Sequence, residues 1–282
     1  MVADLRKLAV KVIADSVRRL LLSAVLCPGE DVLSALSRAM ETEKSPVGRR
    51  ILENLRENAE IAKETGMAYC QDTGMVVVFL EVGQEVMIEG DIEGEINRAV
   101  AAAYSEGYFR KSVLDPLSRV NTGDNAPAVI HYLIVPGNKV TVSVAPKGFG
   151  SENMSFIKML NPSDGVEGIK KAIMEGALSA GGSPCPPVVL GIGIGGTMEK
   201  CALMSKHALL RALGTKNPDP VLHALEEELM IRLNALGLGP MAVGGSTYCL
   251  GVHIESYPTH IAALPLAVNF QCHACRHQSE VI

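Results

Sequence analysis

The spacing of apolar residues predicts helices in the first quarter of the chain. Leu5, Leu8, Val12 and Leu20 follow one another at intervals of three, four and eight residues. Such intervals place apolar side chains on one face of an α-helix. We therefore expect residues 3–66 to be largely helical.

Within this region the sequence marks the start of one helix clearly. Ser45 precedes Pro46, and serine is a favoured N-cap residue while proline fits the first helical position. Apolar residues then recur at helical spacing, and they are Val47, Ile51, Leu52, Leu55, Ala59 and Ala62. Gly66 is a suitable stop, because glycine readily adopts the left-handed conformation that ends many helices.

After residue 66, apolar runs bounded by turn residues predict strands that alternate with helices. The expected strands are 75–82, 128–135, 139–145, 188–194, 248–255 and 261–269. Further helices are expected from Asp91 to about residue 108, from about 197 to 213, and from about 220 to 236. Pro136-Gly137-Asn138 separates two of the strands and predicts a hairpin.

These elements predict an α+β (mixed) fold, with an N-terminal helical layer packed with a mixed β-sheet region and further helices. The sequence contains no repeat, low-complexity segment or linker. We therefore expect a single domain over residues 1–282.

Composition and charge exclude several classes of protein. Of the 282 residues, 48% are hydrophobic and 20% charged, which is too apolar for a disordered chain. A net charge of −5 provides no basic field for nucleic acid or an anionic membrane. Apolar runs fall short of the ~20 residues of a membrane span. The run from Leu20 to Leu26 is only seven residues long, ends without a small residue and has acids upstream, unlike a secretory signal. We expect a cytoplasmic protein, in which seven cysteines are thiols or metal ligands rather than disulfides.

Two motifs leave alternative functions open. Gly191-x-Gly193-x-x-Gly196 matches the dinucleotide fingerprint of a nucleotide-dependent oxidoreductase, but a break and a helix follow where a second strand is needed. Cys272 and Cys275, with His273 and His277, resemble half of the ligand set of a zinc-binding module.

Three other cysteine contexts point to catalysis. Cys70 opens a short polar run before a predicted strand, Cys185 lies between prolines before another, and Cys272 follows a third. Loops at strand ends commonly present functional groups. Three thiolates brought together would leave one corner of a cubane iron–sulfur cluster without a protein ligand, and an open metal position is typical of a catalytic centre.

Several motifs together resemble a known family. They are Cys70-Gln71-Asp72-Thr73-Gly74, Ser151-Glu152-Asn153, Pro184-Cys185-Pro186-Pro187, the glycine-rich run at 191–196, Asn217-Pro218-Asp219-Pro220, Pro258-Thr259-His260-Ile261-Ala262 and Cys272-His273-Ala274. In order and spacing, from about residue 45 onward, they resemble the class I iron–sulfur fumarate hydratases. The similarity is greatest to alpha subunits of the two-subunit form, to which the L(+)-tartrate dehydratase alpha subunit is closely related.

This resemblance implies a set of site residues. A [4Fe-4S] cluster would be held by Cys70, Cys185 and Cys272, although Cys275 departs from the family pattern and leaves the choice between Cys272 and Cys275 open. Substrate contacts are implied at Gln71, Asp72, Arg110 and the backbone near Gly150. The catalytic histidine maps onto His260, so Asp72 and His260 are the expected proton-transfer groups. Without the resemblance, His260 is an ordinary strand-edge histidine and Arg110 a solvated helix end.

The resemblance also implies a reaction and a partner. The reaction is the reversible hydration of fumarate to (S)-malate with an open iron as Lewis acid, and the alternative is dehydration of L(+)-tartrate to oxaloacetate. The substrate is a small dicarboxylate. The remaining half of the site would belong to a beta subunit, a separate chain, in an alpha–beta hetero-oligomer.

Overall fold

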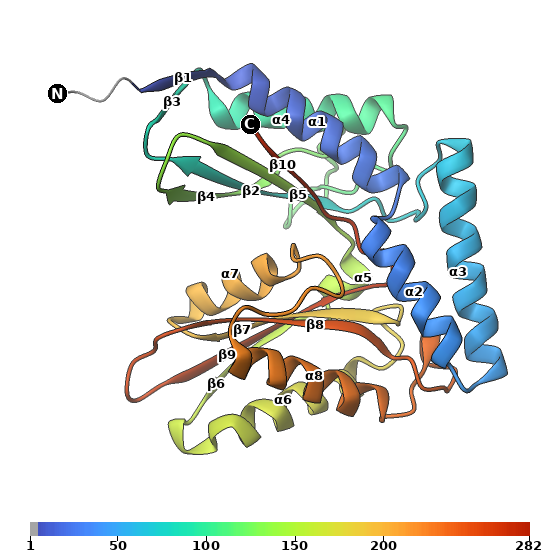
Figure 1. Cartoon of the computed structure of the whole chain (residues 1–282). Helices are drawn as coiled ribbons and strands as arrows, with labels where there is room; N and C mark the ends of the chain where they lie inside the picture. Colours follow the sequence, from blue (N-terminus) through green and yellow to red (C-terminus); the bar gives the residue numbers. More distant parts are fainter. Residues whose placement is uncertain (1–4) are drawn as a thin grey trace. The chain divides into compact units, whose positions relative to one another are not determined.

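The computed structural model describes residues 5–282, which form two compact units (Figure 1). The first unit comprises the chain up to Gly29, Ala59–Phe149 and Arg276–Ile282, and the second comprises Glu30–Asn58 and Gly150–Cys275. The chain passes between the units four times, and two of these crossings lie inside helices α3 (Pro46–Thr65) and α5 (Phe149–Glu152). A crossing inside a helix has no linker composition, which explains why the sequence predicts one domain.

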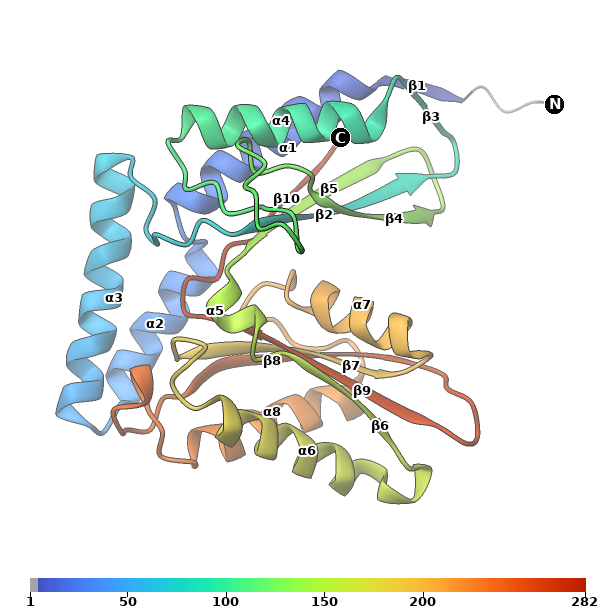
Figure 2. The same ribbon diagram turned by 180° about the vertical axis from the view of Figure 1, so that it is seen from behind.

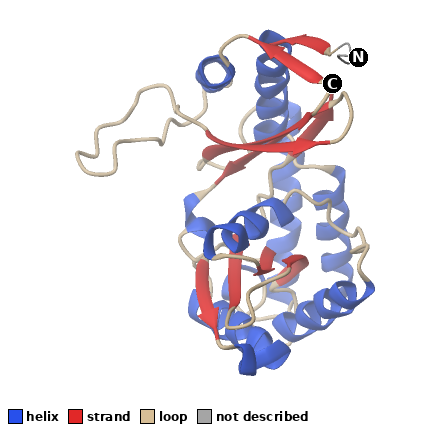
Figure 3. Ribbon diagram, turned by 90° about the vertical axis from the view of Figure 1, so that its left-hand side faces the viewer, coloured by secondary structure: helices blue, strands red, loops and turns tan. Residues whose placement is uncertain are grey.

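The first unit is built on a four-stranded sheet in the order β10-β5-β2-β4. Its strands are β2 (Met75–Gly83), β4 (Val129–Val135), β5 (Val140–Lys147) and β10 (Gln278–Val281). Helices α1 (Val10–Leu26) and α4 (Ile92–Glu106) pack together on one face of this sheet (Figures 2 and 3). The fully buried Val17, Leu21 and Val100 of these helices meet Val78 and Val142 of the sheet in one apolar core.

The predicted hairpin around Pro136-Gly137-Asn138 is wrong, although both of its strands exist. Strand β2 lies between them, parallel to β4 and antiparallel to β5. The connecting turn bonds to the end of β2 instead, where the Gly83 amide donates to the Lys139 carbonyl at 2.8 Å. Because β2 is buried along most of its length, it takes a central position with partners on both sides.

The N-terminal quarter contains the expected helices, α1, α2 (Glu30–Thr42) and α3, preceded by a short strand. They are not a layer of one unit, because α1 belongs to the first unit, α2 to the second, and α3 passes from the second to the first. Residues 3 and 4 of the predicted helix lie outside the described residues. Arg6–Ala9 is strand β1 rather than helix, because it pairs in parallel with β3 (Val86–Glu89). The predicted start of α3 is confirmed, since Ser45 Oγ accepts a hydrogen bond from the Gly48 amide at 3.2 Å.

One stretch, Val10–Thr42, is long and apolar enough to cross a membrane by length and composition alone. In the structure it is divided into α1 and α2, with Pro28-Gly29 between them. Of its most apolar window, 44% is buried inside the protein. Helices in the core of globular proteins meet the same criteria, so this stretch is weak evidence for a membrane span.

The second unit contains a four-stranded sheet in the order β6-β9-β7-β8. Its strands are β6 (Phe156–Leu160), β7 (Val188–Gly195), β8 (Cys249–Tyr257) and β9 (Leu264–Gln271). Helices α6 (Gly165–Ala180) and α8 (Pro220–Asn234) cover one face and α7 (Met198–Ala208) covers the other (Figure 1). With both units sheet-based and helix-covered, the predicted α+β class is confirmed.

The glycine-rich run of β7 serves helix packing. A Cβ on Gly191 would lie 2.1 Å from the Ser205 carbonyl oxygen, and one on Gly193 would lie 2.1 Å from that of Cys201. Both contacts are with the backbone of α7, so only glycine allows this approach. The element after α7 is helix α8, so the second strand that a dinucleotide site requires is missing from this part of the described chain.

Candidate functional site

The loop from Cys70 to Gly74 leads into β2 and is held by buried polar side chains of the first unit. Tyr104 of α4 donates its hydroxyl to the Thr73 carbonyl at 2.7 Å. The Asn125 amide group donates to the Gly74 carbonyl at 3.1 Å. Both side chains are completely buried, so these bonds fix the loop backbone in a water-excluded setting.

The Asp72 carboxylate is fixed at both oxygens by backbone amides. Its Oδ1 accepts from the Gly74 amide at 3.0 Å, and its Oδ2 accepts from the Phe149 amide at 2.8 Å. The Asp72 backbone carbonyl accepts from Nη1 of Arg276 at 2.6 Å. The side chain is half-buried, so it can meet a ligand while being held in one orientation.

The structure places Arg110 beside this loop. Thr73 Oγ1 donates to the Arg110 carbonyl at 2.8 Å, while the Arg110 side chain is exposed. Gln71 is exposed as well, and Cys70 is half-buried. Four of the predicted site residues therefore gather around one loop of the first unit.

The second unit brings together three further predicted residues. The Cys185 carbonyl lies 3.4 Å from the His273 amide nitrogen and 3.0 Å from its Nδ1, so the segment of Cys272 contacts the segment of Cys185. A Cβ on Gly150 would lie 3.7 Å from the Ser183 carbonyl oxygen. Gly150, Cys185 and Cys272 thus lie at the end of the sheet where β7 begins and β9 ends.

The backbone of Cys185 has an unusual conformation. Its φ is +54°, in the left-handed region that residues with a Cβ rarely adopt. Such backbone is retained mostly where the surroundings enforce it, and it is concentrated at functional sites. The Cys185 side chain is exposed, so its thiol is available to a ligand.

Burial separates Cys272 from Cys275. Cys275 is 3% exposed and packs in an apolar cluster with Leu36 and Leu52 of the second unit, whereas Cys272 is half-buried. A cysteine in such a cluster behaves as a small apolar residue. This difference favours Cys272 over Cys275 as a ligand, and it weakens the alternative zinc set.

Two other cysteines are also unsuited to ligand roles. Burial raises the pKa of Cys201 to about 11 and that of Cys249 to about 12. Metal ligation and nucleophilic attack both need the thiolate form. At neutral pH these two residues are therefore protonated thiols of the core.

His260 lies at the opposite end of the second unit's sheet from Cys185 and Cys272. It belongs to the loop between β8 and β9, and β8 runs parallel to β7 with Tyr257 opposite Gly195. The seven residue steps from Val188 to Gly195 span about 23 Å. His260 is exposed, and its Nδ1 accepts a hydrogen bond from the Ala262 amide at 3.2 Å.

Within residues 5–282, no group of three or more His, Cys, Asp or Glu side chains is arranged to hold a metal ion. The predicted donors are divided between the units, with Cys70 in the first and Cys185 and Cys272 in the second. As a donor set they nevertheless fit an iron–sulfur cluster, because all three are thiols in loops next to strands, with Cys185 exposed and the other two only partly buried.

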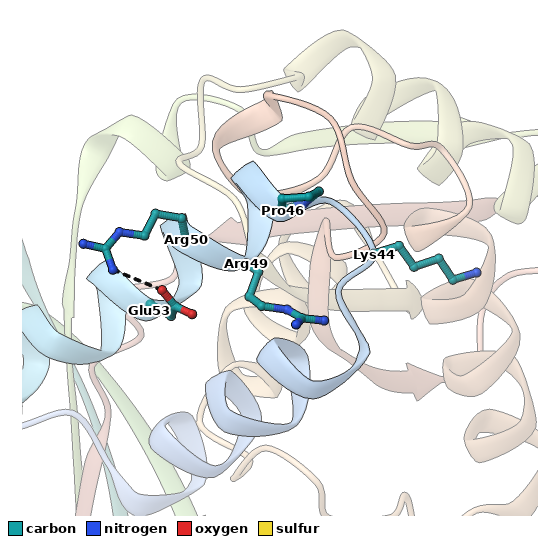
Figure 4. A pocket seen from close by; sticks show the side chains of 5 residues that line it. All are labelled: Lys44, Pro46, Arg49, Arg50 and Glu53. Atoms are coloured by element: carbon teal, nitrogen blue, oxygen red, sulfur yellow. Dashed lines mark hydrogen bonds and ion pairs between the residues drawn. The ribbon is translucent and has the colours of Figure 1, made fainter.

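A separate open pocket lies at the start of α3. It is lined by Lys44, Pro46, Arg49, Arg50 and Glu53 (Figure 4). Arg50 pairs with Glu53 at 3.2 Å, and both side chains are largely exposed. None of the predicted site residues lines this pocket, and its charges are partly paired among themselves.

Sequence reasoning missed the residues that support the Asp72 loop. Tyr104 reads as one more apolar position of α4, and Asn125 lies in a loop with no recognisable motif. Arg276 directly follows the run Cys272–Cys275 and is not part of that cysteine motif. Their roles depend on tertiary contacts that no local pattern records.

The family model described as "Fumarate hydratase (Fumerase)" matches residues 14–281. The chain belongs to the fumarate hydratase family. A protein of Methanocaldococcus jannaschii, provisionally named L(+)-tartrate dehydratase subunit alpha, is 41% identical over 271 residues, which cover 94% of this chain and 95% of the relative. L(+)-tartrate dehydratase subunit alpha of Escherichia coli K12 is 32% identical over 251 residues, covering 88% and 83%.

These matches confirm the resemblance that the motifs indicated. The fumarate hydratase family consists of hydro-lyases, and the matched relatives are named as alpha subunits. The family description refers to fumarate and the names of the relatives to tartrate, so the comparisons do not separate the two substrates.

Proposed function

We propose that this chain is the alpha subunit of a [4Fe-4S]-dependent hydro-lyase that reversibly hydrates fumarate to (S)-malate. The supporting observation is the gathering of Gln71, Asp72 and Arg110 around the loop opened by Cys70, in a chain that the fumarate hydratase family model covers almost completely. The names of the relatives support a second candidate, the dehydration of L(+)-tartrate to oxaloacetate.

In this proposal the cluster ligands are Cys70, Cys185 and Cys272. All three are accessible thiols, whereas Cys201, Cys249 and Cys275 are buried. When bound, the cluster supplies a Lewis-acidic iron that polarises hydroxyl and carboxylate oxygens and makes hydroxide a better leaving group.

Arg110 and Gln71 bind and orient the dicarboxylate. The exposed Arg110 guanidinium can hold a carboxylate through two parallel N–H donors, and the same contact stabilises negative charge as it develops on that carboxylate. The Gln71 side-chain amide adds a further donor beside it. The backbone at Gly150 is exposed and can contribute an amide.

Asp72 is the proposed proton-transfer group of this chain. The amides of Gly74 and Phe149 hold its carboxylate in one orientation, which a general acid or base needs in order to meet the proton next to the substrate carboxylate. General acid–base groups typically contribute about 10²–10⁴-fold to the rate.

His260 is the second proposed proton-transfer group. It lies about one sheet length, roughly 23 Å, from Cys185 in its own unit. We therefore assign it to the site of a neighbouring alpha chain in the assembly. An exposed histidine on a strand-connecting loop is suitably placed to enter another chain's site.

A beta subunit supplies the remainder of the site in this proposal. The relatives are named as alpha subunits, which implies a separate chain, and an alpha–beta hetero-oligomer in the cytoplasm is the assembly we propose. The alpha chain alone is then expected to bind substrate weakly and to lack turnover.

The test is to purify the alpha–beta complex without oxygen and to measure iron, acid-labile sulfide and turnover of malate, fumarate and tartrate. We expect about four iron and four sulfide per alpha chain, as a cubane cluster requires, with the highest kcat/KM for fumarate and malate. A preference for tartrate would establish the second candidate. Zinc in place of iron and sulfide, or a complex without hydro-lyase activity on these acids, would refute the proposal.

A further inference from the structure

Arg276 is a buried cation whose hydrogen bonding is incomplete. It is 3% exposed, and its Nη1 donates to the Asp72 carbonyl. Its Nε and Nη2 are buried and have no hydrogen-bond partner among the described residues. A guanidinium stays charged at all relevant pH values, so such burial costs free energy unless nearby negative charge compensates it.

A candidate for that compensation is the Asp72 carboxylate, across Gly148. A Cβ on Gly148 would lie 3.1 Å from Asp72 Oδ2 and 3.2 Å from Arg276 Nη2. The two charged groups therefore border the same small space above one glycine. Nη2 makes no hydrogen bond to the carboxylate, so the attraction acts through space.

Tyr104 lies close enough to both groups for their charges to act on its hydroxyl. Burial raises the pKa of Tyr104, the Arg276 charge opposes this rise, and the Asp72 charge adds to it. Tyr104 also donates to the backbone of the Asp72 loop. The three side chains thus form one electrostatic group in the first unit.

We propose that Arg276 is a positioning residue for the proton-transfer group Asp72. Nη1 fixes the Asp72 carbonyl, and the buried positive charge across Gly148 keeps the carboxylate on the amides of Gly74 and Phe149. In the low-dielectric interior this attraction is stronger than at the surface. The inference rests on the proposed function only for the catalytic role of Asp72. The positioning itself rests on the hydrogen bonds that the Asp72 carboxylate and carbonyl accept in the structure.

The first test replaces Arg276 with glutamine in the alpha–beta complex and follows amide hydrogen exchange. We expect the amides of Gly74 and Phe149 to exchange at least tenfold faster, because they lose a carboxylate that is held in place. Iron and sulfide content should stay at the wild-type level. Arg276→Lys, which restores the charge without the planar fork, should recover part of the protection.

The second readout is kinetic. Asp72 is proposed to transfer a proton in the transition state, so a misplaced Asp72 carboxylate should slow the chemical step. Arg276→Gln should therefore lower kcat for malate about tenfold to hundredfold and change KM less than about threefold. A role in substrate binding would raise KM instead. Arg276→Lys should again lie between wild type and Arg276→Gln.

A variant in which Arg276 is intact provides a separate test if Arg276→Gln fails to fold. Gly148→Ala places a methyl group against both Asp72 Oδ2 and Arg276 Nη2, whose side-chain ends can shift to accept it. We expect a smaller change in the same direction, in both exchange and kcat.

The matched control is Arg211→Gln in the second unit. Arg211 is also largely buried with an unpartnered Nε, but it pairs with Glu226 at 2.6 Å and lies outside the proposed site. Arg211→Gln should lower the melting temperature without changing kcat or the exchange of the Gly74 and Phe149 amides.

The positioning role would be overturned if Arg276→Gln left those two amides and kcat unchanged, or if exchange rose uniformly throughout the first unit. Failure of the proposed function is distinguishable from these outcomes. An inactive wild-type complex would refute the hydro-lyase assignment, while the exchange measurement would still decide whether Arg276 positions Asp72.

Discussion

At the scale of single residues, exposure separates the candidate ligand cysteines from the cysteines of the core. The sequence alone could separate them only by their neighbouring residues. Positions at the ends of predicted strands singled out Cys70, Cys185 and Cys272, and these three are accessible in the structure. The choice between Cys272 and Cys275 could not be made from spacing. It depends on whether a side chain enters an apolar cluster, which is decided by helices far away in sequence.

We predict that Cys185→Ser abolishes cluster binding and turnover while largely sparing the fold. The hydroxyl is a poor replacement for a thiolate ligand, and the exposed side chain contributes little to packing. Iron and sulfide analysis, visible absorbance and circular dichroism of the anaerobic complex check this prediction.

The matched control is Cys27→Ser. Cys27 is half-buried at the end of α1 and has no proposed ligand role, so its variant should keep cluster and activity. Retention of both properties by Cys185→Ser would show that Cys185 is not a ligand.

At the scale of elements, the sequence predicted most helices and strands but not how the strands pair. Local periodicity located β4 and β5, and the short turn between them suggested a hairpin. Their shared partner β2 comes about 50 residues earlier, and no local signal reports such a pairing. The same reason explains why β10 and β6 were missed, since each is short and depends on a distant neighbour.

We predict that Gly191→Ala destabilises the protein by about 3 kcal/mol or more, at the upper end of overpacking effects. The new Cβ would press against the Ser205 carbonyl, which belongs to helix backbone and cannot rotate away. Thermal unfolding of the complex measures the loss.

Gly66→Ala is the comparison for the previous prediction. Its Cβ would meet nothing within 4 Å, so only the left-handed backbone conformation is strained, at about 1–2 kcal/mol. Equal losses for the two variants would indicate that α7 does not pack tightly on β7.

Glu43 joins the corner between α2 and α3 to the loop before β8, and it makes stability depend on pH. Burial alone raises the pKa of Glu43, but hydrogen bonds from Ser45, Ser246 and Thr247 outweigh it and lower the pKa below the usual value. Because its pKa is lower in the folded state, ionised Glu43 stabilises the protein at pH values above the unfolded-state pKa of about 4.3. This stabilisation is lost as the pH falls through the folded-state pKa.

We therefore predict that wild type loses more stability than Glu43→Gln between about pH 5 and pH 3. Glutamine keeps the shape but cannot titrate, so it should be less stable near neutral pH and show a flatter pH dependence. Urea unfolding at several pH values measures both. Parallel pH curves for the two proteins would contradict this account.

At the scale of the whole molecule, the two compact units could not be predicted from the sequence. Helix α3 is one periodic element from Pro46 to Thr65, yet the part up to Asn58 belongs to the second unit and the rest to the first. The predicted site residues are divided between the units in the same way. Local patterns cannot predict that such distant residues belong to one site, so their prediction depended on the resemblance to a family. The family itself was predictable, because its motifs keep order over most of the chain.

We predict that the alpha–beta complex loses activity in air and regains it with ferrous iron and a thiol. Three protein ligands would leave one iron exposed to oxygen, and that iron can be lost and replaced. Activity on malate and iron content should fall and recover together. Full activity after iron chelation without oxygen would show that the proposed cluster is not needed.

The distance between His260 and the cysteine end of its sheet has a genetic consequence. If each reaction centre is completed by a histidine from another copy, two different inactive chains can complement one another. Co-expression of Cys185→Ser and His260→Ala alpha chains with the beta subunit should then yield mixed assemblies with partial activity, although each mutant alone is inactive. A host that lacks its own fumarase or tartrate dehydratase would reveal such rescue as growth.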